Sequence, residues 1–258
     1  MTNAWGVDAH ARDVMTRVLA EESAAREHVV VYLSGAHAYG FPSPDSDLDL
    51  KAIHVARTAS LLGLALPAPT HDRMGFVDGV EIDYTSNELG HALGGILRGN
   101  GNFIERVLGA SVVQRGDALA SLVPLVKRSL SRRAAHHYKG FAQGQRVEMQ
   151  KTPTVKKLLY VLRTTLTGIH LLETGELVTD VRETAPLHRI ASIDALIERK
   201  RAGEKTPLPE RDAEAWQSRI GTLFEMLETA RDRSPLPEEP PNASEIEAWL
   251  IETRRARF

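Results

Sequence analysis

The chain of 258 residues contains no cysteine, few aromatic residues and almost no net charge. Without cysteine it can form no disulfide, iron–sulfur cluster or thiol nucleophile, and this composition fits a reducing cytoplasm, where we expect the protein. A net charge of −2 gives no overall attraction to nucleic acid. The most apolar run, Leu61 to Leu66, is too short to span a membrane, and the first twenty residues are too polar for a signal peptide. We therefore expect no membrane partner.

The pattern of apolar and turn-forming residues divides the chain into two regions. Up to about residue 116 short apolar strands alternate with helices, and from Asp117 onward the pattern is helical. We predict an α/β domain over residues 1–116 and a helical domain over residues 117–258, which together form an α+β protein. The predicted strands are 29–33, 48–55, 80–85, one near 112–113 and one before Asp78-Gly79. The predicted helices are 8–25, 87–98 with Ser86 as N-cap, 103–108, 121–138, 154–174, 190–200, 209–230 and 243–257.

Residues 33–50, LSGAHAYGFPSPDSDLDL, give the strongest indication of function. Asp47 and Asp49 are two residues apart at the start of a predicted strand, and alternate side chains of a strand point to the same face. We expect both carboxylates to converge there, with Leu48 and Leu50 packed on the other face. Two carboxylates beside a glycine-containing turn suit a magnesium–nucleotide site, because Mg²⁺ prefers oxygen ligands and backbone N–H groups can bind phosphates.

A third acidic residue is predicted from residues 76–84, FVDGVEIDY. Asp78-Gly79 is a strong signal for a two-residue hairpin turn. After the turn, Glu81 and Asp83 alternate with apolar residues and so share one face of a strand. We favour Asp83, which lies deeper in the strand, as the acid that joins Asp47 and Asp49. Three carboxylates could then hold two metal ions about 3.5–4 Å apart.

These motifs resemble the DNA polymerase β-like nucleotidyltransferase superfamily. The residues that carry the resemblance are SGAHAYG, followed by SDLDL and then by a strand ending in EIDY. The longer forms AYGFPSPDSDLDL and DGVEIDY are most similar to the RNA-repair-associated group called RlaP. The resemblance implies a small mixed-sheet nucleotidyltransferase domain of the polymerase β type, followed by a helical domain. It also implies that Asp47, Asp49 and Asp83 are the catalytic residues and bind Mg²⁺ or Mn²⁺.

The predicted nucleotide site departs from this pattern at one position. The superfamily usually has serine after the glycine, whereas this chain has Gly35-Ala36, with Ser34 one residue early. Backbone N–H groups of Ala36 and His37 could still face a phosphate. The missing hydroxyl leaves open an altered or inactive enzyme. The nucleotide-binding residues predicted in this part of the chain are Ser34, Gly35, Ala36, His37 and Ser46.

Residues 127–163 form a strongly basic segment, in which ten lysines and arginines face only Glu148, for a net charge of +9. Such a local positive field attracts polyanions. Lys156, Tyr160 and Arg163 follow helical spacing on one face, where we expect them to bind a triphosphate or a nucleic-acid backbone. The other basic residues proposed to form a nucleic-acid path are Arg132, Arg133, Lys139 and Lys157.

Together, the acidic motifs, the resemblance and the basic segment predict a metal-dependent nucleotidyltransferase. It would move a nucleoside monophosphate from a nucleoside triphosphate to a hydroxyl acceptor, an RNA end, and release pyrophosphate. Two alternatives stay open: transfer to a small molecule or a protein hydroxyl, and a catalytically silent RNA-binding module with the same fold. Ala36 favours the silent module, whereas the retained acids argue against it, because clustered carboxylates repel one another without a cation.

Overall fold

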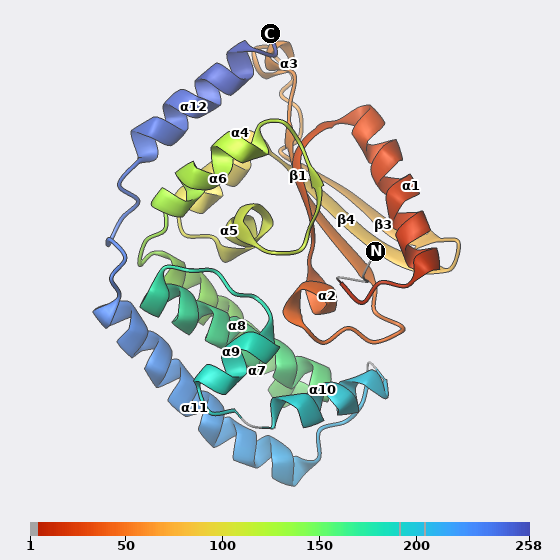
Figure 1. Cartoon of the computed structure of the whole chain (residues 1–258), viewed down its shortest axis with the longest axis vertical. Helices are drawn as coiled ribbons and strands as arrows, with labels where there is room; N and C mark the ends of the chain where they lie inside the picture. Colours follow the sequence, from red (N-terminus) through yellow and green to blue (C-terminus); the bar gives the residue numbers. More distant parts are fainter. Residues whose placement is uncertain (1–4, 191, 204) are drawn as a thin grey trace. The chain divides into compact units, whose positions relative to one another are not determined.

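The computed structural model describes residues 5–190, 192–203 and 205–258 (Figure 1). Over these residues, no helix is both long enough and apolar enough to cross a membrane. The chain forms two compact units. Unit 1 contains the chain up to His37, Asp47–Ser129 and Pro240–Phe258, and unit 2 contains Ala38–Ser46 and Leu130–Glu239. The domain boundary predicted near residue 116 stays a prediction.

Unit 1 is built on a five-stranded mixed sheet with the strand order β3-β4-β2-β1-β5. Strands β2 and β4 are parallel, and the other neighbouring pairs are antiparallel. The strands are β1 (Glu27–Leu33), β2 (Leu48–Val55), β3 (Thr70–Val77), β4 (Val80–Glu88) and β5 (Val112–Arg115). The sheet, together with its helices, confirms the predicted α+β class.

Strand β2 shows the alternation predicted from its sequence. Leu48 and Leu50 are buried in one apolar core with Val14 and Val18 of helix α1 (Ala9–Ala25), whereas Asp49 is only half-buried. Because successive side chains of a strand point to opposite faces, Asp49 projects from the face that α1 does not cover. The burial of Leu48 and Leu50 therefore fixes the direction in which Asp49 points.

The predicted hairpin at Asp78-Gly79 is confirmed. Both residues have positive φ angles, 47° and 80°, and Val77 pairs with Val80 across the turn. Positive φ at both central residues is the geometry that a two-residue hairpin with the right-handed strand twist requires. The turn consequently aligns β4 so that it can pair with β2 on its other side.

The predicted N-cap of the next helix is wrong. Helix α4 (Leu89–Leu97) is capped by Glu88, whose carboxylate accepts hydrogen bonds from the backbone N–H groups of Gly90 and His91 at 2.7 and 3.3 Å. Ser86 belongs to β4 instead, and its hydroxyl lies 2.8 Å from His54 Nδ1. A strand residue with a cross-strand partner is not available as a cap.

The helix predicted over residues 121–138 is also wrong, because two helices replace it. Helix α6 (Leu119–Arg128) ends at Ser129, whose hydroxyl donates to Val126 O at 2.8 Å. The next helix, α7 (Ala134–Lys151), starts after a break in which Arg132 N donates to Pro237 O at 2.8 Å. This contact is long-range, so helical periodicity does not indicate it.

The remaining helices agree with their predicted spans to within a few residues, apart from three short helices that were not predicted. The helices of unit 1 not yet named are α3 (Thr58–Leu61), α5 (Gly101–Leu108) and α12 (Ala243–Arg255), while the five-residue helix α2 (Gly35–Tyr39) includes the boundary between the units. Unit 2 also contains α8 (Val155–Thr174), α9 (Val181–Leu187), α10 (Ile193–Arg201) and α11 (Glu210–Arg233). The three unpredicted helices are α2, α3 and α9.

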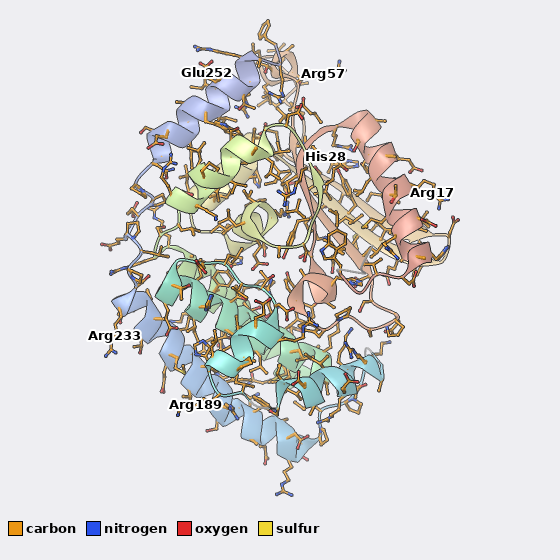
Figure 2. All side chains as sticks on the ribbon, viewed as in Figure 1. Arg17, His28, Arg57, Arg189, Arg233 and Glu252 are labelled. Atoms are coloured by element: carbon orange, nitrogen blue, oxygen red, sulfur yellow. The ribbon has the colours of Figure 1, made fainter. Side chains whose placement is uncertain are left out.

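Polar side chains inside unit 1 form a hydrogen-bonded network around His28. His28 of β1 is 5% exposed, and its ring lies between Ser23 Oγ at 3.1 Å and Tyr84 OH at 2.7 Å. Figure 2 shows His28 inside the unit and Arg17 pointing away from α1. Burial, the largest cause, and the nearby His54 lower the pKa of His28 to about 4. His28 is therefore a neutral hydrogen-bonding group at pH 7.

Candidate functional site

Two of the three predicted acids are direct neighbours in the sheet. In the parallel pairing of β2 with β4, Asp49 lies opposite Asp83. Parallel strands in register present such residues on the same face at adjacent positions. The ammonium group of Lys51 lies within 4 Å of both carboxyl groups, so the two acids are close together. The acidic pair thus comes directly from strand register, with each residue held by a regular strand.

The electrostatics of this pair favour a positive partner. The pKa of Asp49 is raised to about 7, first by burial and then by the negative charge of Asp47, while Lys51 acts in the opposite direction and Asp83 adds to the increase. Asp47 lies immediately before β2 and is half-buried. Asp49 therefore carries its charge poorly unless a cation compensates it.

Lys51 supplies such a charge in this structure, although it is not among the residues predicted from the motif. Its Nζ lies 2.8 Å from Asp83 Oδ1 and 3.7 Å from Asp49 Oδ1, and its side chain is 19% exposed. It also donates to Thr85 Oγ1 at 3.5 Å. The signal that could have identified Lys51 is the same strand alternation, because it lies two residues after Asp49 on the same face.

A divalent cation was predicted for these acids. In the structure as described, from residue 5 onward apart from 191 and 204, no three His, Cys, Asp or Glu side chains are arranged so that they could hold a metal ion. The donor chemistry nevertheless fits Mg²⁺ or Mn²⁺, since carboxylate oxygens are the ligands that these hard cations prefer. The raised pKa of Asp49 also favours a bound cation, because a cation would stabilise the ionised carboxylate. Metal binding by Asp47, Asp49 and Asp83 stays a proposal.

The turn after β1 is fixed against the acidic strand. Ser34 N donates to Asp49 O at 2.8 Å, and Gly35 has a φ of +63°. A Cβ at Gly35 would lie only 2.0 Å from Asp49 Oδ2. The position therefore needs glycine both for its left-handed backbone and for the space that the carboxylate occupies.

The next two residues of this turn are less open than the sequence suggests. Ala36 is buried, and the Nδ1 atom of the buried His37 lies 2.8 Å from Trp5 O. His37 thus helps to hold the N-terminal segment of unit 1. Its predicted contact with a nucleotide, like those of Ser34, Gly35 and Ala36, stays a prediction.

Ser46 belongs to a hydrogen-bonded loop within unit 2. Its hydroxyl accepts from Ser43 N at 3.0 Å and from Lys200 Nζ at 3.0 Å, and Lys200 also donates to Ser43 Oγ at 2.6 Å. Lys200 is fully buried. This lysine was not predicted, and no sequence signal distinguishes it from the other basic residues of IERKR. It fixes the loop that leads directly into Asp47.

The predicted face of α8 separates into two environments within unit 2. Lys156 and Tyr160 line a cavity of about 600 Å³ together with Lys157 and Lys205. Arg163 is only 2% exposed, and its guanidinium stacks over the Tyr39 ring with 3.4 Å between Cζ and the ring centroid. The first two residues therefore have access to a ligand-sized cavity, whereas Arg163 packs inside the unit. Their nucleotide contacts stay predictions.

The basic residues of the predicted nucleic-acid path have partners inside unit 2. Arg132 donates to two backbone carbonyls, those of Ser234 at 2.6 Å and Leu236 at 3.0 Å. Lys157 Nζ donates to Glu148 O at 3.0 Å. The other two form ion pairs, Arg133 with Glu239 and Lys139 with Glu228. Much of the positive charge in this segment thus holds helices together, and its role toward RNA stays a prediction.

Comparisons with known proteins agree with the resemblance read from the motifs. A family model described as the RNA repair pathway DNA polymerase beta family, RlaP, matches residues 10–252. An uncharacterized protein of Methanocaldococcus jannaschii is 28% identical over 224 residues, which cover 85% of this chain and 91% of that protein. The uncharacterized protein YcgL of Bacillus subtilis is 26% identical over 235 residues, covering 83% of this chain and 82% of YcgL.

Among solved structures, a nucleotidyltransferase-like protein from Exiguobacterium sibiricum aligns over 95% of this chain and 80% of its own, with 13% identity and a TM-score of 0.34. The family assignment depends on the family model, which matches nearly the whole chain. The chain belongs to the RlaP group, the RNA repair pathway DNA polymerase beta family.

Proposed function

We propose that this nucleotidyltransferase of the polymerase β type transfers a nucleoside monophosphate from a nucleoside triphosphate to a hydroxyl group at an RNA end. The acceptor oxygen forms a bond to the α-phosphorus, the bond between the α-phosphorus and the oxygen leading to the β-phosphate breaks, and pyrophosphate leaves. The observation that supports this most strongly is the register pairing of Asp49 with Asp83 on a half-buried face.

The proposed site requires positive charge. Asp47, Asp49 and Asp83 are the residues that would hold Mg²⁺ or Mn²⁺, which when bound lowers the pKa of the acceptor hydroxyl and compensates charge on the phosphates. The chain itself positions Asp49 and Asp83 on two paired strands, and it has a glycine, Gly35, where any side chain would meet Asp49. Because these groups are held by regular structure, little reorganisation is needed when the substrates bind.

Lys51 gives the site a charge of its own. Its ammonium group pairs with Asp83 and lies near Asp49, so it reduces the repulsion between the two carboxylates. We therefore assign Lys51 as a positioning residue that keeps the acids together before a cation binds. Phosphate contacts by Lys156, Tyr160 and Arg163 are proposed on the charge pattern of the sequence, and for the first two also on the cavity that they line.

RNA as the acceptor is supported by the family description and by the basic segment at residues 127–163. The second candidate is a catalytically silent RNA-binding module. Two observations favour it: Ala36 stands at the usual serine position, and in the described part of the chain no three His, Cys, Asp or Glu side chains are placed so that they could hold a metal ion. The two candidates differ in whether a nucleotide becomes covalently attached to an acceptor.

The test is incorporation of label from each of the four nucleoside triphosphates, with Mg²⁺ or Mn²⁺ and total RNA. Asp49→Asn removes one charge with little change of shape, and Asp45→Asn makes the same change at an exposed loop residue. Label on RNA that requires Asp49 and not Asp45 supports the proposal. Label on the protein itself would point to a protein acceptor, and RNA binding without any incorporation would support the silent module.

A further inference from the structure

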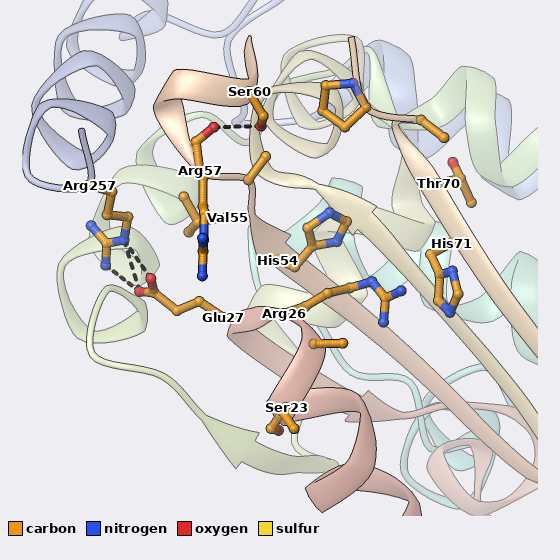
Figure 3. A pocket seen from close by; sticks show the side chains of 15 residues that line it. Ser23, Arg26, Glu27, His54, Val55, Arg57, Ser60, Thr70, His71 and Arg257 are labelled. Carbon is orange, nitrogen blue, oxygen red and sulfur yellow. Dashed lines mark hydrogen bonds and ion pairs between the residues drawn. The ribbon is translucent and has the colours of Figure 1, made fainter. Parts of the chain in front are cut away.

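Unit 1 contains a cavity at the end of its sheet opposite to the acidic pair. Its volume is about 700 Å³, and it is lined by the end of α1, the start of β1, the end of β2, the start of β3 and Arg257 after α12 (Figure 3). His54, in its wall, is five residues along β2 from Asp49, which corresponds to about 16 Å at 3.3 Å per strand residue. The cavity is therefore separate from the acidic pair.

The charged groups in its wall are mostly basic. They are Arg26, Arg57, Arg257 and Glu27, so three positive charges and one negative charge give a net charge of +2. Glu27 is already paired, because Arg257 Nε lies 2.9 Å from both of its carboxylate oxygens. The cavity therefore presents a positive field that is not compensated from within its wall.

Arg57 has the least engaged side chain of the three arginines. Arg26 donates to the buried Glu22 at 2.6 Å, and Arg257 is tied to Glu27. The guanidinium of Arg57, by contrast, forms no hydrogen bond or ion pair with any residue of the described segments. Figure 3 shows its side chain extending into the cavity between those of Arg257 and His54.

The rest of the wall suits an organic ligand more than a bare ion. Val55 and Pro67 contribute apolar surface, and the rings of His54 and His71 are also in the wall. His54 Nδ1 lies 2.8 Å from Ser86 Oγ, so the ring is held in place. Burial is the main cause that lowers the pKa of His54, which makes its ring a neutral hydrogen-bonding group at pH 7. Cavities of this size typically bind small organic molecules.

We propose that this cavity is a second ligand site, which binds the phosphomonoester of a nucleotide, either a free mononucleotide or the phosphorylated end of an RNA strand. Arg57 would bind the phosphate through its guanidinium, whose planar arrangement of N–H groups matches phosphate oxygens in a bidentate contact. Arg26 and Arg257, 20% and 23% exposed, are ion-paired with Glu22 and Glu27, so Arg57 supplies the uncompensated positive charge of this partly dehydrated wall. The apolar and imidazole surface accommodates the nucleoside.

Binding measurements test this site independently of catalysis. The probes are AMP and adenosine, and a 10-nucleotide RNA with a 5′-phosphate or a 5′-hydroxyl, titrated by calorimetry in EDTA so that no divalent metal contributes. We expect at least one phosphorylated probe to bind at least tenfold more tightly than its unphosphorylated counterpart. Binding of AMP identifies a free nucleotide as the ligand, and binding of only the phosphorylated RNA identifies a strand end.

Variants test whether the phosphorylated probes bind in this cavity. Arg57→Ala should weaken binding of the phosphorylated probe at least tenfold, and Arg98→Ala, which removes an exposed arginine of unit 1 outside the cavity, should leave it unchanged. Ala68→Glu, at an exposed wall position, should also weaken binding by adding negative charge. Asp49→Asn should bind as the wild type does, which separates this site from the transferase proposal.

The proposal is overturned if neither phosphorylated probe binds more tightly than its counterpart. It is equally overturned if Arg57→Ala and Ala68→Glu, both shown to be folded by circular dichroism, bind like the wild type.

Discussion

The acidic pair illustrates how far one residue's ionisation depends on its neighbours. Asp49 is half-buried beside two further carboxylates, so its pKa rises to about 7, and Lys51 is the group that limits this increase. The strand alternation predicts that Asp47 and Asp49 share a face, and the same rule places Lys51 there. The sequence does not show that the ammonium reaches Asp83, because that contact requires the register of β2 against β4.

Replacing Lys51 tests whether its ammonium substitutes for a metal cation. Lys51→Met should lower the stability of the metal-free protein by about 1–3 kcal/mol, because it leaves two partly buried carboxylates without their counter-charge. Mn²⁺ should then raise the melting temperature of the variant more than that of the wild type. Lys151→Met, at an exposed ion pair with Glu148, is the control. Equal responses to Mn²⁺ in the wild type and Lys51→Met would show that the ammonium and the metal do not share a site.

His28 makes the stability of unit 1 sensitive to acid. Its pKa is about 4 in the folded protein and about 6.5 when the chain is unfolded. Between these two values the unfolded chain binds the proton and the folded chain does not, so stability present above pH 6.5 is lost as the pH falls toward 4. We expect His28 to account for about 1–2 kcal/mol of the stability lost between pH 7 and pH 5.

The corresponding variant is His28→Gln, which retains hydrogen-bonding capacity without a group that titrates in this range. Urea unfolding at pH 7 and pH 5 should show a smaller loss of stability in the variant than in the wild type. An unchanged loss would mean that other groups cause the acid sensitivity.

Helices, strands and turns were predicted correctly where their conformation depends on residues that are neighbours in the sequence. The Asp78-Gly79 turn requires positive φ angles that these residue types tolerate, and the hairpin is confirmed. The break between α6 and α7 was not predicted, because it depends on Arg132 bonding to a segment more than 100 residues away. Arg163 could be placed on a helix face from its spacing, but its burial against Tyr39 could not.

The turn between β1 and α2 yields a prediction with a matched control. Gly35 and Gly79 both have positive φ angles, but an added Cβ would meet Asp49 Oδ2 at 2.0 Å in the first case and nothing within 4 Å in the second. Both Gly→Ala changes should cost about 1 kcal/mol for the backbone conformation. Only Gly35→Ala should in addition displace Asp49 and reduce nucleotidyl transfer. Urea unfolding and the incorporation assay measure the two effects separately, and equal activity in both variants would argue against a role for this turn.

For the chain as a whole, the motifs predicted the family and the fold class, both of which are confirmed. The cavity lined by Arg26, Arg57 and Arg257 could not be predicted, since its residues come from segments that only the folded sheet brings together. Likewise, the basic segment appears in the sequence as a path for RNA, yet several of its charges are paired within unit 2. Composition identifies charge, but folding determines which charges remain available to a ligand.

Asp49 and Asp83 are proposed to support transfer of a nucleotide. The alternatives are transfer of the terminal phosphate and a protein without transferase activity. The most direct measurement compares triphosphates labelled at the α- or the γ-phosphate, in the presence of Mn²⁺ and RNA, with wild-type protein and Asp49→Asn. We predict that RNA gains the α-label and not the γ-label, and that Asp49→Asn lowers the rate at least about a hundredfold, as expected for loss of a group that stabilises transition-state charge. Incorporation of the γ-label, or equal α-label with wild type and Asp49→Asn, would contradict the claim.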